Sequence, residues 1–173
     1  MLRRRRLLRQ LRSLHTDALN WALICCNYDS ELAEDVLQTV YLKVLEDKAS
    51  FAGRSLLRTW LLGVVRNTAS EARRQARPLL ISLPVEAPVA ATDNLSVREN
   101  DPLASAMREL SAMQRQVIFL VFHRGTTLEE AASILGIQLG SVRTHYHRAK
   151  EKLKSRLIND DRFDTEERRQ SIL

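Results

Sequence analysis

The stretch from Thr126 to Leu157 constrains this chain more than any other, because it holds two amphipathic helix patterns separated by a glycine turn. Thr127 is a suitable N-cap, and Glu130 three residues later completes a capping box. Apolar residues then recur at the i, i+3, i+4, i+7 spacing until Gly136, which takes the left-handed conformation of a helix stop without strain. A second helix is predicted from about Leu139 to Leu157.

Two helices joined by a short glycine turn are typical of a helix-turn-helix, whose second helix enters the major groove of DNA. The outward face of that second helix is rich in side chains that can donate hydrogen bonds to phosphates or base edges: Ser141, Arg143, Thr144, His145, Arg148, Lys150 and Lys152. The alternative is a basic, solvated face on an ordinary helical hairpin. The glycine turn, the capping box and the one-sided charge together favour DNA binding.

Composition indicates an all-α protein with an anionic partner. The chain has 173 residues, enough for one modest core or two small ones, with 45% hydrophobic residues and only 5 glycines and 4 prolines. Its net charge of +6 and pI near 9.8 favour nucleic acid over membrane.

No run approaches the roughly 18 apolar residues of a spanning helix. The arginines at 3–6 precede no sustained apolar run, which argues against secretion. Cys25 and Cys26 are adjacent, which favours packing and a reducing, cytosolic compartment over a disulfide framework.

The first half predicts three helices, over residues 2–26, 31–46 and 56–77, the last stopped by Pro78. The arginines of the first helix fit a solubilising terminus or a nucleic-acid contact equally well. The carboxylates at the start of the second helix lack a complementary histidine or third ligand, so we expect a solvated face and no metal site. The loop aromatic Phe51, Trp60 and the arginines of the third helix suit single-stranded DNA, although a basic solvent face explains them as well.

The second half begins after residues 78–102, which contain all four prolines and read as an extended linker. An acidic tether that mimics nucleic acid inside a basic channel is a weaker interpretation of the same residues. Short helices over 103–110 and 112–124 should then pack on the helix-turn-helix as a four-helix domain. The charged tail is expected to fray or to form a short helix. We therefore predict two small helical domains, residues 1–77 and 103–158, joined by the linker 78–102 and followed by the tail 159–173.

Two segments in this order resemble an extracytoplasmic-function (ECF) sigma factor, the minimal type of the sigma-70 family that keeps only regions 2 and 4. Region 2 is matched by ELAEDVLQTVYLKVLE at 31–46 and FAGRSLLRTWLLGVVRNTA at 51–69. Region 4 is matched by LSAMQRQVIFLVFHRGTTLEEAASILGIQLGSVRTHYHRAKEKL at 110–153. The resemblance covers most of the chain apart from its arginine-rich start, the linker and the tail.

The resemblance implies a role for each segment. Core RNA polymerase would be bound through its β′ clamp helices by Glu34, Asp35 and Gln38, and through the β flap by the first helices of region 4. The −10 promoter element would be recognised and melted by Phe51, Arg54, Arg58, Trp60, Arg66, Asn67, Arg73 and Arg74, with Asn67 holding a flipped-out base. The −35 element would be read by Gly140, Ser141, Arg143, Thr144, His145, His147 and Arg148.

The same resemblance implies a cytoplasmic, non-enzymatic transcription initiation factor. It would act as a monomer within the holoenzyme, without cofactor, metal or membrane insertion, and an anti-sigma factor would restrain it. Gly63, Gln138 and the run 145–147 depart from the usual family residues, which affects the promoter sequence more than the role. Two alternatives remain: a stand-alone helix-turn-helix regulator binding an operator, and an enzyme using His123, His145 and His147. The regulator lacks a marked dimerisation or ligand surface, and histidines two apart on a helix point to different sides.

Overall fold

A computed structural model describes residues 2–80 and 102–170, except for the side chains of residues 2–6, 76–80, 123 and 159–170. Every regular element in these ranges is a helix, which confirms the all-α prediction. The chain divides into two compact units: helices α1 to α4 belong to the first, and α5, α6, η1 and α8 belong to the second. Most of the predicted linker, residues 81–101, lies outside the described residues.

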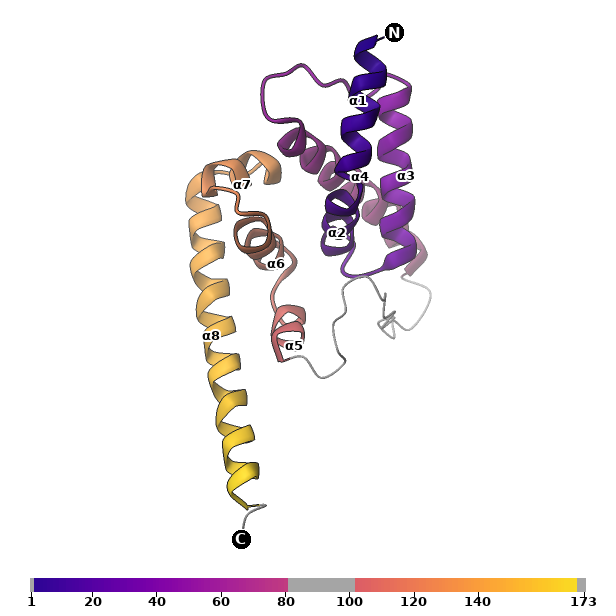
Figure 1. The fold of residues 1–173 in the computed structure, drawn as a ribbon. Coiled ribbons are helices and arrows are strands. Elements are labelled where there is room, and N and C mark those ends of the chain that lie inside the picture. Colours follow the sequence, from indigo (N-terminus) through magenta and orange to yellow (C-terminus); the bar gives the residue numbers. More distant parts are fainter. Residues whose placement is uncertain (1, 81–101, 171–173) are drawn as a thin grey trace. The chain divides into compact units, whose positions relative to one another are not determined.

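The first unit is built on three mutually packed helices, α2 (His15–Cys25), α3 (Ser30–Leu45) and α4 (Leu57–Leu80), preceded by α1 (Leu2–Ser13). Figure 1 shows α2 continuing beyond α1, α3 returning beside them and α4 crossing the bundle. The Asp29 side chain caps α3 by accepting the Leu32 N–H at 3.0 Å. Trp21 is fully buried at the centre, where its indole N–H donates to the Leu62 carbonyl at 2.9 Å. This bond ties α2 to α4 inside the core.

Two predicted helix limits in this unit are wrong. The single helix expected over residues 2–26 breaks at Leu14, where the backbone turns to φ −98° and ψ 4°. The Ser13 hydroxyl donates to the Gln10 carbonyl at 2.8 Å there, in competition with the helical bonds. Helix α4 does not stop before Pro78 but continues to Leu80. Pro78 lies in the last turn, and the one intrahelical bond that its missing N–H removes is the bond to the Arg74 carbonyl.

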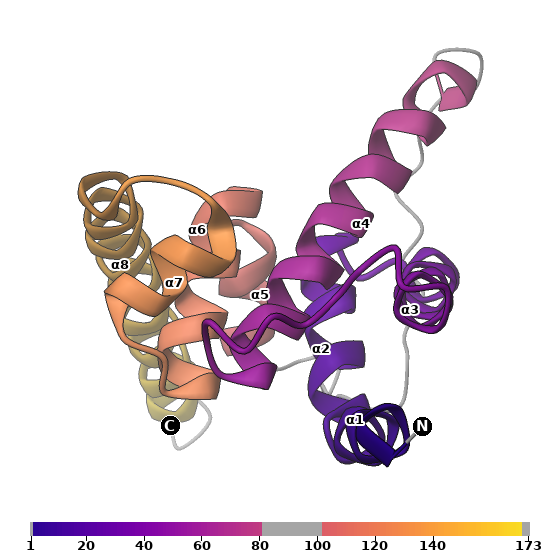
Figure 2. The same cartoon turned by 90° about the horizontal axis from the view of Figure 1, so that it is seen from above.

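The second unit contains α5 (Pro102–Arg108), α6 (Ala112–Ile118), the π-helix η1 (Phe119–His123) and α8 (Leu139–Gln170). Helix α7 (Leu128–Leu135) precedes α8 and is divided between the two units at Ala131. Helices α5 and α6 pack against α8. Figure 2 views α8 nearly end-on, with α5 and α6 beside it. The core of this unit is small, and its fully or largely buried residues include Leu110, Val117, Ile118, Leu120, Val142 and Ala149. Ser111 begins α6 with a capping box completed by Gln114.

Two further helix predictions need correction. The helix expected over 112–124 is α-helical only to Ile118 and continues as a π-helix, in which residues five apart lie above one another. The Arg124 guanidinium accordingly lies over the Phe119 ring, 5.4 Å from its centroid. Helix α8 does not end near Leu157 but runs to Gln170, so most of the predicted tail is helical. No glycine or proline follows Leu157 to break it.

None of the helices in the described ranges is long and apolar enough to cross a membrane. Within the same ranges, no group of three or more histidine, cysteine or acidic side chains is placed to hold a metal ion.

Candidate nucleic-acid interfaces

The helix-turn-helix has the local structure that its sequence predicts. The Thr127 hydroxyl accepts the Glu130 N–H at 3.1 Å, and the Glu130 carboxylate accepts the Thr127 N–H at 3.1 Å, which completes the capping box. Gly136 ends α7 with φ +57°, a value that L side chains rarely adopt. The Gln138 carbonyl then accepts the N–H groups of Ser141 and Val142 at 3.0 and 3.2 Å, which starts α8.

Helix α8 separates a buried stripe from an exposed polar face. Val142 and Ala149 are fully buried, and Tyr146 and Leu153 are partly buried. The residues predicted to read the −35 element lie on the remaining faces: Gly140, Ser141, Arg143, Thr144, His147 and Arg148 are exposed, and His145 is half-buried. Arg143 has one ion-pair partner among the described residues, Glu129 at 3.9 Å, and both side chains are largely exposed. Such a pair holds weakly, so the guanidinium is available to a ligand.

Two other predicted donors on α8 donate hydrogen bonds to main-chain carbonyls. The Thr144 hydroxyl donates to the Gly140 carbonyl at 3.0 Å, which leaves its oxygen lone pairs for a ligand. The Lys152 ammonium donates to the Glu109 carbonyl near the end of α5, and Arg156 binds the Glu109 carboxylate at 2.7 Å. Lys152 therefore faces α5 and does not lie on the DNA-reading face as the sequence analysis expected.

A second cation completes the cap of α5. Arg115 is only 5% exposed, and its guanidinium donates to the carbonyls of Arg108 and Leu110 at 3.4 and 3.1 Å. Cations at a helix C-terminus satisfy free carbonyls and interact favourably with the helix dipole. The cap fixes α5 and α6 against the recognition helix. Sequence analysis missed Arg115 and Lys152 in this role, because their partners are main-chain carbonyls and leave no side-chain pattern.

In the first unit, the loop before α4 and the first turn of α4 bring one group of predicted residues together. The rings of Phe51 and Trp60 are 5.4 Å apart between centroids and tilted by 52°, and both are half-buried. The Arg58 Nε lies 3.5 Å from the Asp17 carboxylate of α2. Leu56, between these residues, is 69% exposed. Aromatic faces beside an exposed apolar residue are the kind of surface on which unstacked bases rest.

A second group lies further along α4. Asn67, Arg73 and Arg74 are exposed and Arg66 is half-buried, while Arg73 also donates to the Cys25 carbonyl at 3.2 Å. Asn67 follows Arg58 by nine residues, roughly 14 Å along the helix axis. The structure therefore divides the predicted −10 residues into two groups along α4, with exposed Arg54 in the preceding loop.

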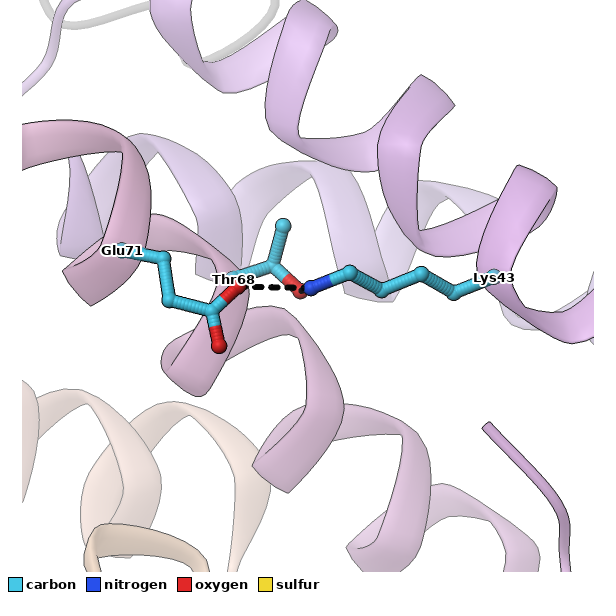
Figure 3. Close-up of polar contacts among 3 residues, drawn as sticks. All are labelled: Lys43, Thr68 and Glu71. Carbon is cyan, nitrogen blue, oxygen red and sulfur yellow. Dashed lines mark hydrogen bonds and ion pairs between the residues drawn. The ribbon is translucent and has the colours of Figure 1, made fainter. Parts of the chain in front are cut away.

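A polar cluster that the sequence analysis missed joins α3 to α4 next to Asn67. The Lys43 ammonium donates to the Thr68 hydroxyl at 3.2 Å and to the Glu71 carboxylate at 2.7 Å (Figure 3). Thr68 is buried, so its hydroxyl needs a partner of this kind. Because Lys43 and Glu71 belong to different helices, no periodic spacing in the sequence could have predicted the cluster.

The outward face of α3 carries the predicted polymerase-binding residues. Glu34, Asp35 and Gln38 are all exposed. Leu42 and Leu45 continue the exposed surface toward the end of the helix and are 49% and 39% exposed. Val44, between these two leucines, is buried in the core. Exposed leucines beside acidic and amide groups suit a protein partner better than DNA.

Cys25 and Cys26 are free thiols, both buried. Burial raises the pKa of both, that of Cys26 to about 12, and the adjacent Cys26 further raises that of Cys25. Neutral, buried thiols react slowly, and this arrangement fits the packing role predicted for them.

The capped α7, the turn at Gly136 and the exposed donors of α8 define a helix-turn-helix DNA-binding protein. The other helical unit of the chain is the bundle of α1 to α4. Comparison with known families agrees in both parts of the chain. The family model for Sigma-70 region 2 matches residues 4–78, and the one for Sigma-70, region 4 matches residues 106–155.

Curated relatives cover most of the chain. The ECF RNA polymerase sigma factor SigX of Bacillus subtilis is 29% identical over 153 residues, which span 81% of this chain and 79% of the relative. The RNA polymerase sigma-E factor of Streptomyces avermitilis is 30% identical over 143 residues, or 79% of each chain. Among solved structures, the sigma factor RpoE of Bartonella quintana, in complex with the anti-sigma factor NepR, matches with a TM-score of 0.69 and 27% identity over 87% of this chain and 96% of that one. The chain belongs to the sigma-70 family and is an ECF sigma factor.

Proposed function

We propose that this sigma factor binds core RNA polymerase, places its two units on the −10 and −35 elements of promoters and helps to melt the −10 element. The observation that carries the proposal is the presence of two distinct candidate DNA-binding surfaces in one chain, in the order of regions 2 and 4. RNA synthesis stays with the polymerase, so the protein itself is not an enzyme and acts in the cytoplasm.

Each surface has a chemistry that suits its proposed element. The exposed donors of α8 from Gly140 to Arg148 fit base edges and phosphates in the major groove of the −35 element. The Phe51–Trp60 pair and the polar groups around Asn67 fit a strand whose bases have left the duplex. Glu34, Asp35 and Gln38 on α3 would contact the β′ clamp helices, and α5 and α6 would contact the β flap.

In this proposal the cluster of Lys43, Thr68 and Glu71 fixes the position of α4 relative to α3. It joins the helix proposed to bind polymerase to the helix proposed to hold the melted strand, at the residue after Asn67. Binding to polymerase would thereby place Asn67 at a defined position relative to the DNA.

An anti-sigma factor is a further proposed partner. One structural relative, the sigma factor RpoE, was solved in complex with the anti-sigma factor NepR, and another, CnrH, was solved in complex with the cytosolic domain of CnrY. The exposed leucines of α3 offer an apolar surface to such a partner, and so does exposed Phe122, whose ring is stacked 5.9 Å from that of Tyr146 in the second unit.

Run-off transcription with purified core polymerase and a library of genomic promoters tests the proposal. We expect transcripts with defined start sites only when both core polymerase and this protein are present. The absence of core binding and of specific transcripts would contradict it. Tight binding of the isolated protein to duplex operator DNA would instead support the stand-alone regulator.

A further inference from the structure

Helix α1 carries a dense run of positive charge with no acidic residue to balance it. Its sequence, LRRRRLLRQLRS, contains six arginines and no acidic residue. The whole chain has 27 basic and 21 acidic residues, so 21 of each remain outside α1. The six positive charges of α1 thus equal the net charge of the whole chain, and they come in addition to the basic residues of the two candidate DNA-reading surfaces.

The described part of α1 is docked by its leucines and leaves its arginines available. Leu11 is 2% exposed, and Leu7 and Leu14 are half-buried at the i, i+4, i+7 spacing of one helix face. Arg9 and Arg12 are exposed, and neither forms an ion pair with a described residue. Like charges at this density repel one another along a helix, so the free protein gains nothing from them and an anionic partner would relieve the repulsion.

Two contacts place the end of α1 next to the candidate −10 surface. Just after the break at Leu14, the His15 Nδ1 lies 2.9 Å from the Tyr41 hydroxyl of α3. Asp17 is the ion-pair partner of Arg58, in the first turn of α4. The residues that directly follow α1, from His15 to Asp17, are thus held against α3 and α4, and α1 extends from them. Its 12 residues span roughly 18 Å, which is about five nucleotides of a duplex strand.

We propose that α1 is a third DNA contact, an arginine arm that binds the phosphates flanking the −10 element without reading their sequence. The inference rests on the proposed function, since only a promoter complex brings DNA to this side of the first unit. Guanidinium groups bind phosphate oxygens through two parallel hydrogen bonds. Contacts of this kind fix the position of the protein on DNA and supply affinity that falls with salt.

The test is the salt dependence of promoter binding by holoenzyme carrying Arg9→Gln and Arg12→Gln together. The matched control is Lys48→Gln with Lys154→Gln, which removes the same charge from exposed positions outside the proposed DNA and polymerase surfaces. Promoter affinity is measured from about 50 to 200 mM KCl, and affinity for core polymerase is measured separately. Arg9→Lys with Arg12→Lys keeps the charge and serves as a rescue.

We expect the slope of log affinity against log salt to become shallower by about 1 to 2 in the arginine variant, because each phosphate contact contributes roughly 0.9. Affinity at the lowest salt should fall about tenfold, equally for the promoter and for a fragment with a scrambled −10 element. The control and the lysine variant should keep the wild-type slope within measurement error.

Three results would overturn the inference. A slope equal to that of the control would exclude phosphate contacts by Arg9 and Arg12. A loss of core affinity with an unchanged slope would assign the arm to an acidic surface of polymerase. A change in the −10 sequence preference would make it a base-reading element. Failure of the proposed function is separate, because wild-type holoenzyme would then give no start-specific transcripts.

Discussion

In the first unit, four of the eight side chains proposed to act on the −10 element are held by neighbours: Phe51 rests against Trp60, Arg58 binds Asp17 and Arg73 donates to the Cys25 carbonyl. In the second unit, the residues proposed to read the −35 element stand on the exposed face of one helix. Among the described residues, Arg143 forms a single ion pair, a weak and exposed one with Glu129. The same chain thus presents one preorganised surface and one open surface.

The difference follows from what each surface is proposed to bind. A base taken out of the duplex has lost a few kcal/mol of stacking and pairing, and a surface already in place recovers this loss without a further ordering cost. The major groove is open to donors on an exposed helix, so the side chains need only a rigid backbone beneath them. In this protein the cap of α5 by Arg115 and Lys152 supplies that rigidity.

The largest effect should come from Trp21→Ala. It removes a fully buried side chain and its bond to the Leu62 carbonyl, and we expect the first unit to lose about 3–5 kcal/mol of stability. Urea unfolding followed by circular dichroism should show an early transition for this unit only. Leu120→Ala, the matched change in the second unit, should shift the other transition. A single transition that moves in both variants would show that the units do not unfold separately.

Arg143→Ala should weaken recognition of the −35 element by about 1–3 kcal/mol if the guanidinium contacts a base pair there. Opening of the −10 element on a promoter that is already bound should not change, because the first unit is untouched. Equilibrium binding of holoenzyme and permanganate reactivity of the melted strand measure the two quantities. Lys154→Ala, which removes an exposed charge further along α8, is the control. An equal loss in both variants would indicate a general charge effect.

Thr127→Ala should destabilise the second unit by about 1 kcal/mol, because it removes the hydroxyl that accepts the Glu130 N–H. Thermal unfolding of wild type and variant measures the change. Thr127→Ser keeps the cap and should restore stability. If alanine and serine behave alike, the capping box does not contribute to this unit.

The smallest expected effect is a gain in stability of the first unit. Gly63 lies within α4, has no positive φ, and a Cβ added there would meet nothing within 4 Å. Gly63→Ala should therefore stabilise the first unit by about 0.5–1 kcal/mol. Denaturant midpoints compare the two proteins. A loss of stability would mean that the helix needs the glycine for a reason other than space, such as approach of a partner.

The sequence predicted the helix-turn-helix well because its signals are local. The capping box of Thr127 and Glu130, the left-handed Gly136 and the buried stripe of Val142 and Ala149 depend only on residues within a few turns. The overall helical fold followed from periodicity in the same way: Leu11, Ala18, Trp21 and Cys25 recur at helical spacing, and all four are buried.

What the sequence could not predict depends on contacts between helices. The break at Leu14 lies inside an unbroken apolar pattern, and only the Ser13 hydroxyl and the docking of α2 against α3 and α4 account for it. Lys43 and Lys152 are chemically alike, yet one joins α3 to α4 and the other caps α5. Their partners lie 25 or more residues away in the chain, where no spacing rule applies.

The division of work between the two units is tested most directly by run-off transcription from two promoters that differ only in the −35 element, one intact and one scrambled. Wild-type protein and Asn67→Ala should both lose activity when the element is scrambled, with Asn67→Ala lower on each promoter because opening is impaired. Transcription with Arg143→Ala should already be low on the intact promoter and should fall little further on the scrambled one, because the substitution has removed the contact that scrambling disrupts. The account is contradicted if Arg143→Ala loses as much as wild type on the scrambled promoter.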